Sequence, residues 1–212
     1  MKRFLTYYIF VIPAWVSAWL LYEQINLESQ SSLIKFVYWT IAKLIIWILP
    51  IVVIVRFWIR RPLVEYLSLH EWKKGTKSGA VIGLVFIGLS FILDFFMRRF
   101  GLPQITIGFF SAVFLAPVLE ETVYRGYALG SLEKSGYGFW LSNFVAALAF
   151  LGIHLPGWYF MGSSNITQPI VILSIILIGM IAGYAKRKSG STWASIVVHF
   201  INNLYSSFIR NN

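Results

Sequence analysis

The sequence predicts an all-α fold, a polytopic bundle of about seven transmembrane helices. Hydrophobic residues make up 58% of the 212 residues and charged residues only 12%, which is about half the charged share of a soluble domain. Several apolar runs reach the length of about 18 residues that crosses a bilayer. No run alternates apolar and polar residues as a barrel strand does. Because backbone groups in lipid must pair within their own segment, each span is expected to be a helix.

The expected spans are each close to 20 residues long, or roughly 30 Å of helix. We interpret the first as a retained span and not a signal peptide, because its apolar run is long and has no small-residue cleavage site. Residues 1–104 are expected to hold the N-terminal transmembrane helices and a cytoplasmic amphipathic loop, and residues 105–212 a core of four helices. The seven spans cover residues 4–22, 36–57, 79–97, 105–125, 138–155, 168–185 and 191–209.

The net charge of +10 has a membrane explanation, so we expect no nucleic-acid partner. Basic residues gather in alternate loops, and cytoplasmic loops are the ones that carry such an excess. This bias predicts an N-terminus in the cytoplasm and a C-terminus outside. On the side predicted to be cytoplasmic lie twelve bases, namely Lys2, Arg3, Arg56, Arg60, Arg61, Lys73, Lys74, Lys77, Lys134, Lys186, Arg187 and Lys188, against Lys35, Arg98, Arg99 and Arg210 on the other.

The only long polar connection is "RRPLVEYLSLHEWKKGTKSG", residues 60–79. Apolar residues alternate there with bases, a pattern typical of a short helix that lies on an anionic membrane surface. We therefore expect this loop to rest on the cytoplasmic face of the bilayer. The apolar residues in question are Leu63, Tyr66, Leu67, Leu69 and Trp72.

Two charged residues within the expected spans have simple structural interpretations. Lys43 lies near one end of its span, from where a lysine can reach the headgroups. Asp94 stands four residues before Arg98, which predicts a local ion pair. Glu121 and Arg125 share that spacing and are also expected to pair on one helix face. That pair would neutralise both charges and leave them in a supporting role.

Glu120 points about 100° away from Glu121 on a helix and therefore needs another partner. The candidates are two histidines at membrane depth, His154 and His199, together with Asn203, which lies four residues after His199. A lone histidine on an apolar helix is most often a hydrogen-bonded core residue. As a set, however, these groups can hold a water, take its proton and donate to an oxyanion.

The same residues leave a metal mechanism open. Two histidines and a glutamate form a zinc set with an open position, so Glu120, His154 and His199 are the expected ligands if Zn²⁺ is bound. A metal-free mechanism in which a glutamate activates the water is the alternative. Cysteine is absent from the chain, which excludes thiolate ligands and a cysteine nucleophile.

Three short motifs in the C-terminal half resemble those of one family of intramembrane endopeptidases. "EETVYR" (Glu120–Arg125) resembles its EExxxR motif, Phe150 and His154 match FxxxH, and His199 and Asn203 match an HxxxN motif. All three occur in order, each on an expected helix. On these residues the chain is similar to the CAAX-protease and bacteriocin-processing (CPBP, or Abi) family over about residues 105–209.

The resemblance implies a role for each matched residue. Glu120 would be the general base and His154 would orient the water. His199 and Asn203 would form the oxyanion hole. The supporting residues would be Glu121, Arg125 and Phe150, the last of which would pack the pocket. The family is labelled metalloprotease, although a metal-free glutamate mechanism has been argued for its CAAX members. Its site lies in a cavity that opens toward the cytoplasm.

We therefore expect an intramembrane endopeptidase, embedded in a bacterial cell membrane, that hydrolyses a membrane-associated peptide. A prenylated protein or a leader peptide would be its substrate. The alternative from another class is a non-catalytic immunity or peptide-binding protein that uses the same cavity. A transporter or proton relay would require repeated halves with broken helices, and the sequence shows none.

Overall fold

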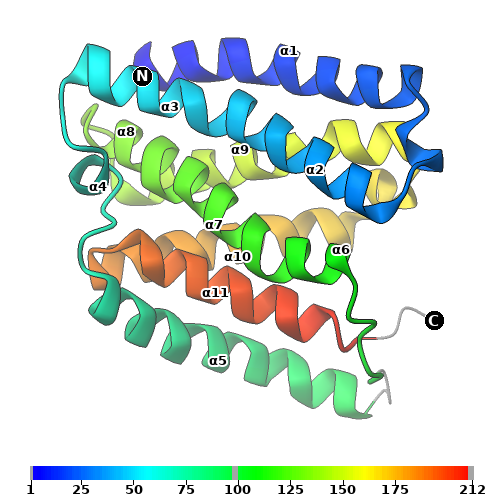
Figure 1. Ribbon diagram of the computed structural model, residues 1–212. Helices are drawn as coiled ribbons and strands as arrows, with labels where there is room; N and C mark the ends of the chain where they lie inside the picture. Colours follow the sequence, from blue (N-terminus) through cyan, green and yellow to red (C-terminus); the bar gives the residue numbers. More distant parts are fainter. Residues whose placement is uncertain (1, 97–99, 210–212) are drawn as a thin grey trace.

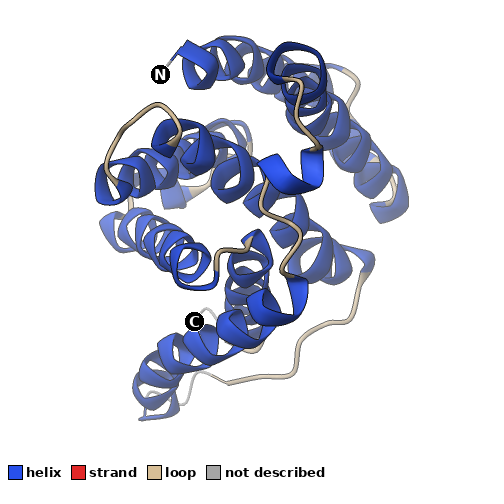
Figure 2. Cartoon of the chain, turned by 90° about the vertical axis from the view of Figure 1, so that its left-hand side faces the viewer, coloured by secondary structure: helices blue, strands red, loops and turns tan. Residues whose placement is uncertain are grey.

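The computed structural model describes residues 2–96 and 100–209 and confirms the all-α fold (Figure 1). Apart from one antiparallel bridge between Phe100 and Ile209, these residues form helices and loops (Figure 2). The elements are α1 (Lys2–Gln24), η1 (Leu27–Ser29), α2 (Ser32–Lys43), η2 (Leu44–Ile48), α3 (Leu49–Val53), η3 (Ile54–Ile59), α4 (Leu63–Tyr66), α5 (Trp72–Phe96), α6 (Ile107–Phe110), η4 (Ser111–Leu115), α7 (Ala116–Glu121), η5 (Thr122–Leu129), α8 (Gly130–Glu133), α9 (Phe139–Phe160), η6 (Ser164–Thr167), α10 (Pro169–Ser189) and α11 (Thr192–Ser206).

Six helical stretches of the described chain are long and apolar enough to cross a membrane, one fewer than expected. The seventh expected span, residues 191–209, is α11, which has 15 residues and would reach roughly 22 Å at 1.5 Å per residue. It lies beside α5 in the bundle (Figure 1). The six stretches are Phe4–Gln24, Ser32–Ile59, Trp72–Ile92, Ile107–Glu133, Phe139–Phe160 and Pro169–Ser189.

The fourth span is longer than predicted, because α6, η4, α7, η5 and α8 follow one another without a break from Ile107 to Glu133. The predicted span ended at residue 125, which put Glu120 near one membrane surface and His154 near the other. In the structure Glu120 lies roughly 20 Å from either end of its stretch, and His154 roughly 22 Å from the start of α9. The longer helix therefore brings both residues to a similar depth.

Two π-helical segments, η4 and η5, flank the acidic pair in this stretch. Wide turns of this kind occur often at functional sites. Pro117 follows the first of them, and since proline has no N–H it cannot donate the hydrogen bond of its own turn. The backbone is thus irregular where the sequence places Pro117 and the carboxylates.

The loop 60–79 contains one short helix, and two of the five apolar residues expected on the membrane surface are buried in the protein. Only Leu63–Tyr66 are helical before α5 begins at Trp72. Tyr66 and Leu67 are buried in the protein core. The Tyr66 hydroxyl lies 3.0 Å from Ser131 Oγ, and the Leu67 carbonyl accepts a hydrogen bond from Thr192 Oγ1 at 2.6 Å. Tyr66 and Leu67 therefore pack between α8 and α11, whereas Val64 and Trp72 are exposed, at 54% and 56%.

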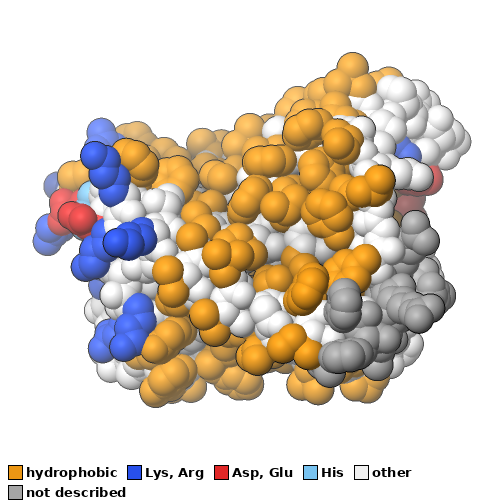
Figure 3. All heavy atoms as spheres, turned by 90° about the horizontal axis from the view of Figure 1, so that it is seen from below, with side chains coloured by type: hydrophobic (Ala, Val, Ile, Leu, Met, Phe, Trp, Pro, Cys, Tyr) orange, Lys and Arg blue, Asp and Glu red, His pale blue; other side chains and the backbone are white. Residues whose placement is uncertain are grey.

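Basic side chains gather at one end of the bundle, while apolar side chains cover much of the face seen in Figure 3. That end holds the start of α1 and α5 and the end of η3, α8 and α10 (Figure 1). Many apolar residues on these helices are exposed, among them Phe10, Phe57 and Leu89. A surface of this size and composition fits a bilayer, and the chain is an integral membrane protein.

The predicted ion pair of Asp94 involves Arg98, which lies outside the described residues. Within them, the Tyr205 hydroxyl donates a hydrogen bond to Asp94 Oδ2 at 2.6 Å. This contact joins the end of α5 to the end of α11, which helps to keep α11 in place beside α5.

Candidate active site

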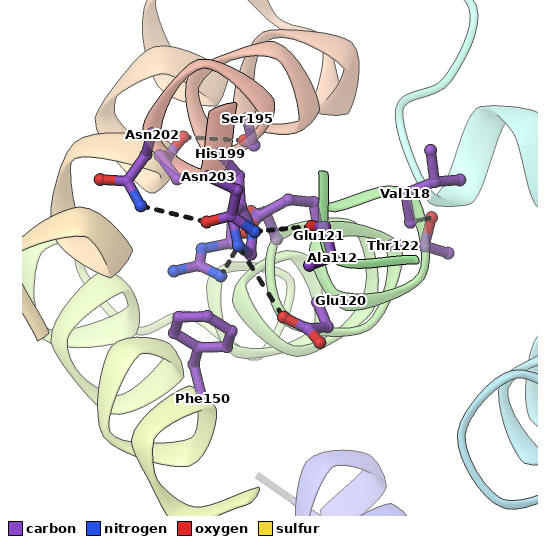
Figure 4. A network of polar contacts seen from close by, with 12 residues as sticks. Ala112, Val118, Glu120, Glu121, Thr122, Phe150, Ser195, His199, Asn202 and Asn203 are labelled. Carbon is purple, nitrogen blue, oxygen red and sulfur yellow. Dashed lines mark hydrogen bonds and ion pairs between the residues drawn. The ribbon is translucent and has the colours of Figure 1, made fainter. Parts of the chain in front are cut away.

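Glu120 and Glu121 lie at the end of α7, and their side chains have different partners (Figure 4). Both are buried, at 7% and 1% exposure. Neighbouring residues on a helix point in directions roughly 100° apart. The consequence is visible in the contacts: Glu121 joins Arg125 and His199, while Glu120 faces a cavity and Lys43.

Glu121 forms the centre of a buried charged network. Its Oε1 atom accepts from Arg125 Nη1 at 2.9 Å, as the spacing predicted, and lies 2.8 Å from His199 Nδ1. A carboxylate can only accept, so His199 Nδ1 carries the hydrogen. Glu121 therefore sets both the tautomer and the orientation of the ring, in the manner of a carboxylate behind a catalytic histidine.

The other ring nitrogen of His199 points toward Glu120. His199 Nε2 lies 3.9 Å from Glu120 Oε2, too far for a direct hydrogen bond but a distance that a shared water can bridge. The structure thus places the two glutamates on opposite sides of one imidazole. The adjacent carboxylates differ in role because one orients the ring and the other faces its free nitrogen.

Lys43 does not reach the headgroups, contrary to the sequence-based interpretation. Its Nζ lies 3.3 Å from Glu120 Oε1, and the two side chains are 18% and 9% exposed. It also lies 5.0 Å from the centre of the Trp47 ring. The prediction was wrong because the second membrane stretch runs from Ser32 to Ile59, so Lys43 is roughly 17 Å from its start. A charged residue at that depth of a membrane span is itself a sequence signal that could have identified Lys43 as a site residue.

His154 is held by the residue one turn before it. Its Nδ1 lies 2.8 Å from the carbonyl oxygen of Phe150, which can only accept, so Nδ1 carries the hydrogen and Nε2 has the lone pair. The Phe150 ring meets the rings of His154 and His199 edge to face, at 4.9 and 5.6 Å between centres. The Arg125 guanidinium lies 4.7 Å from the same ring. Phe150 therefore separates the two histidines and packs against the arginine.

The Asn203 side chain forms a hydrogen bond to the irregular backbone of the fourth span. Its Nδ2 donates to the Ala112 carbonyl at 2.9 Å, and its Oδ1 accepts from Asn202 at 3.1 Å (Figure 4). In the wide turns of η4 each N–H donates to the carbonyl oxygen five residues earlier, as the Ala116 N–H does to the Ser111 carbonyl. The same pattern would pair the N–H of residue 117 with the Ala112 carbonyl, but Pro117 has no N–H. One amide hydrogen of Asn203 is thus used to satisfy the carbonyl that Pro117 leaves free.

A cavity of about 330 Å³ lies beside Glu120 and His154 and is bounded mainly by the N-terminal helices and α9. Glu120, His154 and Lys43 are its ionisable lining residues, and His199 and Asn203 do not line it. The cavity extends to Met161, just beyond the end of α9, so it occupies the half of the bundle away from the basic end (Figure 1). Its walls include five tryptophans, Trp15, Trp19, Trp39, Trp47 and Trp158.

The predicted zinc ligands do not fit a metal ion as they are folded. Both histidines have Nδ1 anchored and Nε2 available, as metal-binding histidines do. Glu120, however, already has the Lys43 ammonium beside it. Across the described residues no three histidine, cysteine, aspartate or glutamate side chains are grouped to hold a metal. Zinc at Glu120, His154 and His199 therefore stays a prediction.

Comparisons with known proteins place the site-bearing helices in a family match. Residues 102–205 match the family described as type II CAAX prenyl endopeptidase Rce1-like. An uncharacterized 24.3 kDa protein of Escherichia coli is 22% identical over 213 residues, which covers 93% of each chain. No solved structure matches the chain. The family match spans all three motifs and the helices that carry them, as the resemblance predicted. The C-terminal half of the chain, residues 102–205, belongs to the Rce1-like family of type II CAAX prenyl endopeptidases.

Proposed function

We propose that this protein is an intramembrane endopeptidase that hydrolyses a peptide bond of a membrane-associated peptide or protein. The observation that carries the proposal is the shared cavity: a buried carboxylate, Glu120, and a histidine with a free Nε2, His154, line one space at mid-membrane depth. Such a pair can hold a water and take its proton. The match of residues 102–205 to a protease family supports the same reaction class.

In the proposed reaction a water sits between Glu120 and the lone pair of His154 Nε2. Glu120 takes the proton as the water oxygen bonds to the carbonyl carbon of the substrate, and a tetrahedral oxyanion forms. The same proton then passes from Glu120 to the amine that leaves as the C–N bond breaks. The carboxylate is restored, so one water is consumed for each peptide bond.

Lys43 is proposed to position the base. It contacts Glu120 Oε1, which leaves Oε2 directed toward His199 Nε2 and the water. Two cations, Lys43 and Arg125, then balance the two carboxylates. A balanced set of this kind is the arrangement in which buried charges are tolerated.

The resemblance implies His199 and Asn203 as the oxyanion donors. Because His199 Nδ1 already donates to Glu121, His199 can donate to the oxyanion only from Nε2, which requires a protonated ring. Asn203 Nδ2 has a second hydrogen besides the one it gives to Ala112. His199 is fixed by Glu121, so its position is set before the substrate enters. Prearranged donors are worth the most in a dry site, because they need no reorganisation during the reaction.

The proposed location is a bacterial cell membrane, with the N-terminus in the cytoplasm. The basic end of the bundle would then face the cytoplasm, and the cavity would lie in the outer half of the membrane. This differs from the cytoplasmic opening that the resemblance implies. Five tryptophans around the cavity suit an apolar substrate segment, such as the prenyl group of a modified protein or the apolar part of a leader peptide.

The alternative proposal is a binder that holds such a peptide without cleaving it. The contact that favours it is the Lys43–Glu120 ion pair, because a carboxylate held by an ammonium is a weaker base. The two functions differ in what happens to the bound peptide.

The test uses purified protein in liposomes with a library of membrane-anchored peptides, analysed by mass spectrometry. Hydrolysis predicts pairs of products whose masses add up to the substrate plus one water, and their loss in Glu120→Gln. Peptides that copurify intact, with no product pair above the Glu120→Gln background, would establish the binder and contradict the protease.

A further inference from the structure

A second cavity, of about 250 Å³, lies at the basic end of the bundle, where α8, α9 and α10 meet. Three cations line it, Lys134, Lys186 and Arg187, with Glu133 as the one carboxylate on the described wall. Arg187 Nη1 pairs with Glu133 Oε1 at 3.3 Å, so the one carboxylate offsets only one of the three cations. The cavity therefore has an excess of positive charge. It is separate from the tryptophan-lined cavity, with which it shares no lining residue.

Lys186 is the unusual member of this group. It is only 7% exposed, and its ammonium donates to the backbone carbonyl of Arg125. No carboxylate of the described chain forms an ion pair with it. A buried ammonium that has no carboxylate in direct contact is costly, so an anion bound in the cavity would stabilise it.

Lys134 adds a second ammonium close to the first. A side-chain carbon at Gly130 would lie 3.5 Å from Lys186 Nζ and 3.7 Å from Lys134 Nζ. Both nitrogens thus approach the same point on the cavity wall. Lys134 is held there by the Tyr66 carbonyl at 2.9 Å and by the face of the Tyr66 ring at 3.6 Å. Two like charges fixed side by side attract a multivalent anion strongly.

The position of this cavity favours a lipid headgroup as the source of the anion. Lys134 and Gly190 directly follow the ends of the fourth and sixth membrane stretches, so the cavity lies at headgroup level. Phe139, at the start of α9, forms part of the wall. The next residues, Trp140 and Leu141, are exposed at 64% and 54%, as interfacial anchors beside acyl chains are. Basic pockets between transmembrane helices are known to hold phosphate headgroups.

We infer that this cavity, lined by Lys134, Lys186 and Arg187, binds the phosphate of an anionic phospholipid. The site is also connected to the catalytic network. Lys186 bonds to the Arg125 carbonyl, and Arg125 pairs with Glu121, which holds His199. A lipid bound at Lys186 would therefore stabilise the helix that carries Glu120. The inference does not depend on the proposed hydrolysis.

The test measures lipid binding to the delipidated full-length protein in detergent, by native mass spectrometry and thermal unfolding. The probes are phosphatidylglycerol, phosphatidylcholine and inorganic phosphate. Lys134→Gln and Arg187→Gln remove exposed charges, so both should fold. Lys188→Gln is the matched control, because Lys188 is also an exposed base on α10 but does not line the cavity.

We expect phosphatidylglycerol to raise the unfolding temperature and phosphatidylcholine to have little effect. Each cavity variant should bind phosphatidylglycerol about fivefold more weakly, since one base near a charged headgroup contributes about that factor. The control should bind as the wild type does. Equal binding of the two lipids, or equal loss in Lys188→Gln, would overturn the inference. Stabilisation by inorganic phosphate as strong as that by the lipid would overturn the lipid as the source of the anion.

Discussion

Lys43 Nζ lies 3.3 Å from Glu120 Oε1, which joins the two halves of the chain inside the membrane. The N-terminal helices are therefore part of the candidate active site, although the family match covers only residues 102–205. Lys43 provides the cation beside the proposed base, and four of the five cavity tryptophans come from the same half. The C-terminal core carries the motifs, and the N-terminal helices complete the space around them.

Substitution of Lys43 should lower both stability and activity. Lys43→Met leaves the buried Glu120 carboxylate without its counter-ion, which is expected to cost about 1–3 kcal/mol of the free energy of unfolding. The rate of peptide hydrolysis should fall about tenfold or more, because Glu120 loses its fixed orientation. Lys43→Arg, which retains the charge, should recover part of the rate. Unfolding in detergent and cleavage kinetics measure the two effects.

A double variant separates the stability effect from the catalytic one. Lys43→Met combined with Glu120→Gln removes both charges, so it should be more stable than Lys43→Met alone and remain inactive. A single Lys43→Met variant with wild-type stability and rate would show that the contact has no role in the site.

Gly179 leaves room for the Arg125 guanidinium. A side-chain carbon at Gly179 would lie 2.8 Å from Arg125 Nη2, and Arg125 is fully buried with no space to retreat. Gly179→Ala should therefore disturb the Arg125–Glu121–His199 network and lower the hydrolysis rate about tenfold or more. Gly88→Ala is the matched control, since Gly88 is also in a membrane helix but nothing lies within 4 Å of its added carbon. Equal rates for the two variants would argue against this network.

Metal removal tests the zinc prediction. Because Lys43 lies beside Glu120 and the described residues contain no group of three ligands for a metal, we expect the cleavage rate to survive prolonged treatment with a chelator. Metal content of the purified protein, measured by mass spectrometry, should be well below one zinc per chain. One zinc per chain, with activity that is lost on chelation and restored by zinc, would instead establish the His154–His199–Glu120 site.

The absence of cysteine makes the orientation directly measurable. Met161→Cys, at the cavity and 68% exposed, should react with a membrane-impermeant thiol reagent on intact cells. Glu71→Cys, in the exposed loop before α5, should react only after lysis. The reverse pattern would place the cavity toward the cytoplasm and the basic end outside.

The different orientations of Glu120 and Glu121 could be predicted from the sequence because they depend on local helix geometry. Helical spacing alone pairs Glu121 with Arg125 and turns Glu120 away, and both hold in the structure. The helical class follows equally from composition, since lipid leaves few options for the backbone.

Contacts between distant segments could not be predicted in this way. Lys43 and Glu120 are 77 residues apart, and His199 and Glu121 are 78 apart, so no spacing rule connects them. The burial of Tyr66 and Leu67 was missed for a related reason. An apolar face in a basic loop can pack on lipid or on protein, and only the tertiary structure shows that α8 and α11 cover it.

The rate of hydrolysis by Glu120→Gln tests the central claim most directly. The assay uses protein reconstituted in liposomes with a peptide that the wild type cleaves, and Glu71→Gln, which removes an exposed carboxylate, is the control. Because the amide cannot take the proton of water, the rate should fall by about 10²–10⁴-fold while the unfolding temperature changes little. Cleavage by Glu120→Gln at the wild-type rate would contradict the assignment of Glu120 as the base.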